Sequence, residues 1–148
     1  MTFGVNAAYT GDNYGFSITY GSIETSTTEE DTFTALNGYF TPDAEGFPSI
    51  SVGYETGDDG SVTSSADGLE SFFVGLTWDE VGAGSVGIAM GTKTPTIEET
   101  DEQIMYEAYY SYPINDGMTI TPLVYAKEVS TAGSDDETGV MVKTSFRL

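Results

Sequence analysis

Large apolar residues recur at every second position along most of this chain, and this period of two is its strongest constraint on the fold. Tyr14, Phe16, Ile18 and Tyr20 would share one side of an extended strand, with small or polar residues on the other. Eight further segments show a similar division, near residues 3–9, 33–41, 50–54, 72–78, 86–90, 104–112, 118–128 and 140–146. We therefore expect an all-β protein with about nine strands and no helix longer than two turns.

The connections between these segments alternate in kind. Short, turn-forming stretches lie at residues 11–13, 41–48, 79–84 and 113–117. Between them lie four polar loops with four acidic residues each, Glu24–Asp31, Thr56–Glu70, Thr92–Glu102 and Glu128–Glu137. This alternation predicts an antiparallel up-and-down meander, with residues 1–148 forming one unit.

Two of the nine segments divide less clearly. In Phe33–Thr41, either Leu36 and Phe40 or Phe33 and Tyr39 could belong to the apolar side. In Met118–Glu128, Pro122 falls on the apolar side, and a proline cannot donate a ladder hydrogen bond. We predict a strand in both places, with a bulge or a missing bond at Pro122.

Composition excludes several classes of function. The chain has 24 acidic and only 4 basic residues, a formal charge of −20, which disfavours binding to nucleic acid. It has no cysteine and no histidine, so thiol chemistry, Ser-His catalysis and the commonest metal ligands are missing. We expect neither an enzyme nor a cofactor, and no pair of carboxylates stands out as catalytic.

Alternation alone fits both a membrane β-barrel and a soluble, secreted β-sandwich that binds carbohydrate or calcium through acidic loops. Three features favour the barrel: small residues opposite the apolar ones, alternating short turns and long loops, and aromatic residues near the short turns. The aromatic residues are Tyr9, Tyr14, Tyr39, Phe40, Phe47, Trp78, Tyr110 and Tyr112. Solubility without detergent would separate the two alternatives.

One long segment resembles a known family. Glu107–Tyr125, which reads Glu-Ala-Tyr-Tyr-Ser-Tyr-Pro-Ile-Asn-Asp-Gly-Met-Thr-Ile-Thr-Pro-Leu-Val-Tyr, is similar to the penultimate hairpin of cyanobacterial porins of the carbohydrate-selective (OprB-type) family. Leu36–Pro42 and Val140–Phe146 resemble other segments of that barrel. The resemblance spans essentially the whole chain and corresponds to the C-terminal part of the barrel.

The resemblance implies a porin of the bacterial outer membrane, through which small hydrophilic solutes, sugars or ions diffuse passively. Its partners would be membrane lipid, those solutes and barrel strands upstream of this segment; family members are often homotrimers. Family members also begin with a signal peptide and a surface-layer-homology segment, and neither is visible after Met1. Outer-membrane barrels usually finish on an aromatic residue, whereas this chain finishes Phe146-Arg147-Leu148.

Several polar and aromatic residues are candidates to line a channel. If the apolar side faces lipid, all four cations have inward parity: Lys93, Lys127, Lys143 and Arg147. They could favour anions or balance Glu55 and Glu107. The alternative is that any barrel would place them inside, because a lysine or arginine facing lipid costs ~2–4 kcal/mol at the middle of the bilayer. Inward Tyr109, Tyr125 and Phe73 could stack on sugars or pack against an inward loop.

The acidic loops raise the question of calcium. Asp58-Asp59-Gly60 and Ser134-Asp135-Asp136-Glu137 supply oxygen ligands, but neither has the alternating ligand spacing of an EF-hand loop. We expect solvated surface loops and assign no metal site, with loose binding of divalent ions as the alternative.

Overall fold

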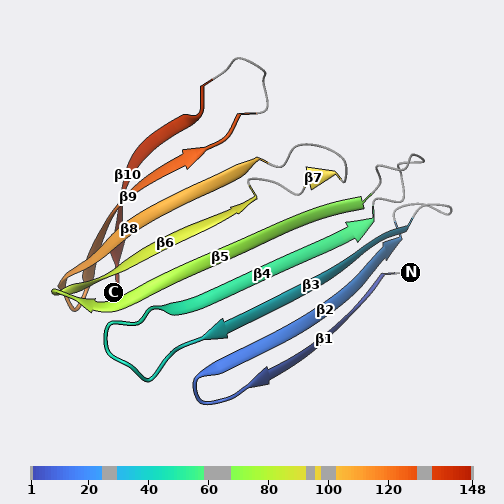
Figure 1. Cartoon of the computed structure of the whole chain (residues 1–148), viewed down its shortest axis with the longest axis horizontal. Helices are drawn as coiled ribbons and strands as arrows, with labels where there is room; N and C mark the ends of the chain where they lie inside the picture. The colour runs from blue at the N-terminus through green and yellow to red at the C-terminus, as the bar shows by residue number, and fades with distance from the viewer. Residues whose placement is uncertain are drawn as a thin grey trace.

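The computed structural model of the chain describes residues 2–24, 30–58, 68–92, 96–97, 103–129 and 135–147. These residues form one antiparallel sheet (Figure 1). Within the described ranges, no helix is long and apolar enough to cross a membrane.

Nine strands follow one another across the sheet in the order of the chain, in the order β1-β2-β3-β4-β5-β6-β8-β9-β10. This confirms the predicted up-and-down meander. A tenth strand of two residues, β7, pairs with β5 and was not predicted. The strands are β1 (Phe3–Thr10), β2 (Tyr14–Glu24), β3 (Glu30–Phe40), β4 (Ser49–Asp58), β5 (Gly68–Val81), β6 (Gly84–Thr92), β7 (Thr96–Ile97), β8 (Ile104–Asn115), β9 (Met118–Lys127) and β10 (Glu137–Phe146).

The four short connections lie at one end of the sheet, which we call the turn end; the opposite end is the loop end (Figure 1). The β1–β2 turn is closed by a hydrogen bond from the Gly11 amide to the Tyr14 carbonyl, at 2.8 Å. The β5–β6 turn needs backbone in the left-handed region at Glu80 and Gly82, with φ of 57° and 65°.

Two predicted loops are shorter than expected. We predicted polar loops over Glu24–Asp31 and Thr56–Glu70, but Glu24 pairs with Glu30 and Asp58 pairs with Gly68. Polar side chains at a strand end do not prevent the backbone ladder from continuing where water still reaches them. The hairpins therefore extend beyond the apolar part of the strands.

The register divides the side chains into two faces. Residues directly opposite each other in an antiparallel pair lie on the same side of the sheet, so one row of partners defines one face. We call the first face the apolar face. Its central row runs through Tyr14, Phe40, Ile50, Leu76, Ile88, Ala108, Val124 and Val140.

The opposite side is the small-residue face, with glycine, alanine, serine, threonine and asparagine at most positions. Its corresponding row runs through Gly15, Tyr39, Ser51, Gly75, Ala89, Glu107, Tyr125 and Gly139. Each row crosses eight strands and stays on one side of the sheet, so the alternation seen in the sequence gives the sheet two chemically different faces.

The two ambiguous segments are resolved by the register. In β3, Leu36 pairs with Ile18 and Phe40 with Tyr14, so both lie on the apolar face. In β9, Leu123 and Ile120 pair with residues of β8, but the two residues between them, Thr121 and Pro122, do not. Pro122 therefore has no paired residue in β8, as expected. The shift of register in this hairpin lies elsewhere, between Pro113 and Asn115.

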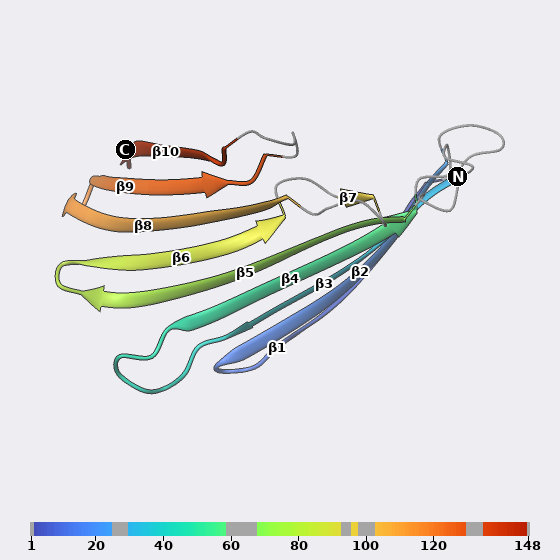
Figure 2. The ribbon, with the colours of Figure 1, turned by 45° about the horizontal axis from the view of Figure 1, so that its top comes forward.

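The described residues contain no buried hydrophobic side chain. Figure 2 shows why: the strands form a single curved layer, and no second layer packs on either face. A β-sandwich needs two sheets with a core between them, so the sandwich alternative is wrong for this part of the chain. Within the described residues, β1 and β10 each pair on one side only and form the two open edges.

Candidate functional site

Aromatic side chains mark the turn end of the apolar face. Tyr9 stacks on Phe16 with ring centroids 5.6 Å apart and lies 5.9 Å from Tyr14. The Tyr110 ring stacks on Tyr112, and its hydroxyl donates to the Val81 carbonyl at 2.9 Å. With Phe40 and Trp78, these rings form the girdle that the sequence predicted at the turn end. Phe47 lies at the same end, in the β3–β4 connection, and one predicted residue is an exception.

That exception is Tyr39. It was predicted in the girdle, but it pairs with Gly15 on the small-residue face. Its ring lies so close over Gly15 that a methyl group there would overlap it. The glycine provides the space for the Tyr39 ring on the small-residue face, and Phe40, the next residue of the strand, points to the opposite side.

A second aromatic group lies at the loop end of the apolar face and was missed from the sequence. Phe3 lies 5.9 Å from Tyr20, and the Tyr54 hydroxyl donates to the Glu70 carboxylate at 2.9 Å. Phe72 and Tyr106 share this face. The available signal was positional: these rings have the same parity as the turn-end girdle but lie at the other end of their strands.

Between the two aromatic groups, the apolar face is aliphatic. Most of its side chains are exposed, up to 81% at Val140, and Val74, Leu76 and Val86 are half-buried. The band comprises Val5, Ile18, Leu36, Ile50, Val52, Val74, Leu76, Val86, Ile88, Met90, Val124, Val140 and Val142. Aliphatic side chains between two rows of aromatic ones match the pattern of a surface that contacts a bilayer.

Aromatic rings on the small-residue face lie close over glycines, most of them on the adjacent strand. Tyr109 covers Gly87, and Tyr125 covers Gly139, each the directly paired residue. Phe33 covers Gly21 in the same way, and Phe73 lies against Gly75 of its own strand. Such pairs shield the backbone where a glycine leaves it bare. Sugar stacking by Tyr109, Tyr125 and Phe73 stays a prediction, since their observed contacts are within the sheet.

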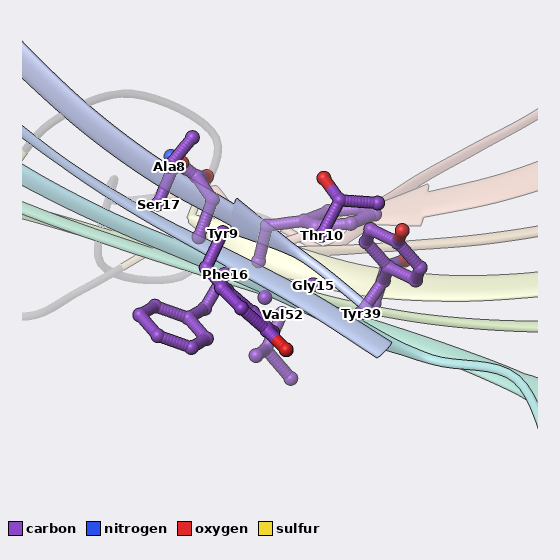
Figure 3. A pocket seen from close by; sticks show the side chains of 12 residues that line it. Ala8, Tyr9, Thr10, Gly15, Phe16, Ser17, Tyr39 and Val52 are labelled. Carbon is purple, nitrogen blue, oxygen red and sulfur yellow. The ribbon is translucent and has the colours of Figure 1, made fainter. Parts of the chain in front are cut away.

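Figure 3 shows side chains of both faces in a close view of the turn end of β1–β4. Phe16 and Val52 project to one side of the sheet, while Ala8, Thr10 and Tyr39 project to the other. The shallow hollow drawn there is lined from both faces, because it follows the spaces left by small residues such as Gly15 and Gly38. None of its lining residues is charged.

The candidate channel-lining residues within the described strands all lie on the small-residue face. Glu55 pairs with Ala35 and Ser71, and Glu107 pairs with Ala89 and Tyr125. Lys127 forms a salt bridge of 2.9 Å with Glu137 at the loop end. The register also places Tyr109, Tyr125 and Lys143 on this face.

The two remaining candidates are placed differently. Arg147 follows β10 at the turn end, where its amide donates to the Gly117 carbonyl at 2.8 Å. Lys93 lies outside the described residues, as do Asp59, Gly60 and Ser134 of the suggested calcium loops. Over the part of the chain that is described, no three acidic side chains converge to hold a metal ion.

Comparison with known proteins adds no assignment, since no family model, curated protein or solved structure matches this chain.

Proposed function

We propose that this chain forms part of the wall of an outer-membrane porin, a water-filled channel for passive diffusion of small hydrophilic solutes. The observation that carries the proposal is the exposed aliphatic band between two aromatic groups on a single-layer sheet. In water such a face would aggregate, because an exposed apolar patch of this extent is not tolerated by a soluble monomer. In a bilayer it is the surface that lipid requires.

The small-residue face supplies the other half of a channel. Its small and hydroxyl-bearing side chains leave room for water beside the wall, and its few charged groups lie among them. Three charged residues of the described strands, Glu55, Glu107 and Lys143, have this parity, whereas Glu70 lies on the apolar face near the loop end. Transport would need no chemistry, only a hydrated path.

The open edges determine what else the channel requires. Backbone N–H and C=O groups on β1 and β10 have no strand partner on their outer side in the described sheet. Unpaired groups in lipid cost several kcal/mol each, so a stable barrel needs further strands between β10 and β1. We place the assembly in the bacterial outer membrane, where a homotrimer remains the expectation from family resemblance.

Trp78, the only tryptophan, provides the test. It lies in the turn-end girdle of the apolar face, paired with Val86. In lipid vesicles, its fluorescence should be quenched more strongly by lipids brominated near the headgroup than by lipids brominated near the chain ends. A tryptophan moved to the aliphatic band, Ile88→Trp in a Trp78→Phe background, should show the reverse preference.

Tryptophan emission typical of water in both variants, together with solubility of the chain without detergent, would overturn the proposal. Quenching at both sites with no dependence on depth would show surface adsorption and would contradict it as well.

A further inference from the structure

We propose that the channel favours small inorganic cations over anions, an inference that rests on the proposed function and specifies its solute class. The inference depends on which charged side chains of the small-residue face form ion pairs and which do not. The sequence left open a basic wall that favours anions. The pairing of the side chains points the other way.

Lys127 is the first reason. It lies on the small-residue face at the loop end, but its ammonium group lies 2.9 Å from the Glu137 carboxylate. The register makes Lys127 and Glu137 direct cross-strand partners, so the pair is built into the β9–β10 ladder. An ion pair of this kind presents almost no net charge to a passing solute.

Glu55 and Glu107 are the second reason. Their cross-strand neighbours are Ala35, Ser71, Ala89 and Tyr125, none of which carries positive charge. Among the described residues, no lysine or arginine lies within salt-bridge distance of either carboxylate. Lys143 is the one cation of this face without an acidic partner within the described strands. Within the described part of the wall, the two carboxylates of Glu55 and Glu107 are therefore uncompensated, against one unpaired positive charge at Lys143.

The turn end adds to this imbalance. Six exposed acidic residues and no basic one lie in its connections and in the last residues of β5: Asp12, Asp43, Glu45, Asp79, Glu80 and Asp116. Only Arg147, at the end of β10, counters them there. Rings of carboxylates at the entrance of a channel raise the local concentration of cations and lower that of anions.

The test is the reversal potential of the channel in planar bilayers, using the assembly purified from membranes that contain this chain, in a potassium chloride gradient. Removing one elementary charge ~7 Å from the ion path changes the local ion concentration roughly threefold in water. We expect a cation-to-anion permeability ratio above unity. The double variant Glu55→Gln/Glu107→Gln should lower that ratio by roughly threefold or more at low salt, because each lost charge lowers the local cation concentration and raises the local anion concentration, and the effect should fade as salt screens the charges.

Glu70→Gln is the matched control. Glu70 lies on the apolar face near the loop end, and a glutamine there can still accept the Tyr54 hydroxyl. It removes one of the same negative charges, against two in the double variant, but from the other side of the sheet, so the ratio should stay at the wild-type value. Retained conductance in every variant shows that the channel is intact.

The outcomes are separable. A conducting channel with a permeability ratio at or below unity, or an equal fall with Glu70→Gln, overturns the cation preference and leaves the porin proposal standing. Absence of any conductance overturns the porin proposal and, with it, the inference that depends on it.

Discussion

At Gly91 the backbone of β6 passes so close to β5 that a side chain has no space. A methyl group there would lie 2.6 Å from the Phe72 carbonyl oxygen and 3.3 Å from the Phe73 Cα. Gly91→Ala should therefore destabilise the folded sheet by ~1–3 kcal/mol, the usual cost of overpacking. The measurement is the urea concentration at the midpoint of unfolding from detergent micelles.

Gly38 is the matched control, because it lies inside β3 and a methyl group there would make only ordinary contacts at 3.6 Å. Gly38→Ala should unfold at or slightly above the wild-type midpoint, since alanine reduces the freedom of the unfolded chain. Equal midpoints for the two variants would show that the β5–β6 approach is looser than described.

Lys143 allows a single charge of the small-residue face to be reversed. It is exposed in β10, directly opposite Thr121. Lys143→Glu removes a positive charge and adds a negative one, so the reversal potential of the channel should shift toward cations. Lys143→Arg retains the charge and should leave the potential unchanged. No shift in Lys143→Glu would show that Lys143 does not face the ion path.

At the scale of a single strand, β4 offers two adjacent positions on opposite faces. Val52 belongs to the aliphatic band, whereas Ser51 belongs to the small-residue face. Val52→Lys places a charge against lipid and should cost ~2–4 kcal/mol near the middle of the bilayer. Ser51→Lys should cost much less, because its ammonium group reaches water.

The comparison of unfolding midpoints in lipid vesicles for these two variants tests the assignment of faces. If Ser51→Lys were the more destabilising substitution, the apolar and small-residue faces would have the opposite environments from those proposed. A soluble sheet, by contrast, would tolerate lysine at Val52, so tolerance there would contradict membrane insertion.

Most strands and their faces were predictable from the sequence. Side chains alternate along a strand, so the local sequence is enough to show which of them share a face. Tyr14–Tyr20 and Phe72–Trp78 were assigned in this way, and the register agrees. β3 could not be assigned, because the choice between Leu36 and Tyr39 depends on which neighbour provides space. That space is Gly15, a residue on another strand, which local alternation does not reveal.

Strand ends and charge pairing were less predictable for a related reason. The continuation of β2 and β3 to Glu24 and Glu30 depends on the ladder between strands, not on the polarity of either segment. The sequence placed Lys127 on the correct parity, but its neutralisation by Glu137 depends on the β9–β10 register. Parity is thus a local property, whereas pairing is a property of the sheet.

For the whole molecule, the number of strands determines how a closed barrel could arise. The meander has nine strands, so β1 and β10 run in the same direction. Joining them directly would create a parallel seam, whereas an odd number of further strands between them keeps every pair antiparallel. A second copy inserted with its loops at the same end would also meet these edges in parallel. Additional strands of odd number are therefore the simplest completion.

Amide hydrogen exchange on the chain refolded in detergent tests whether these edges are open. Amides of β4 and β5 are held in ladders on both sides, whereas β1 and β10 have a strand neighbour on one side only. We expect peptides covering residues 3–10 and 137–146 to exchange much faster than those covering 49–58 and 68–81, because edge amides open without breaking the rest of the sheet. Equal protection of all four segments, in a particle whose mass corresponds to one copy of the chain, would mean that β1 and β10 pair with each other. The chain would then close by itself with a parallel seam, and the requirement for further strands would be wrong.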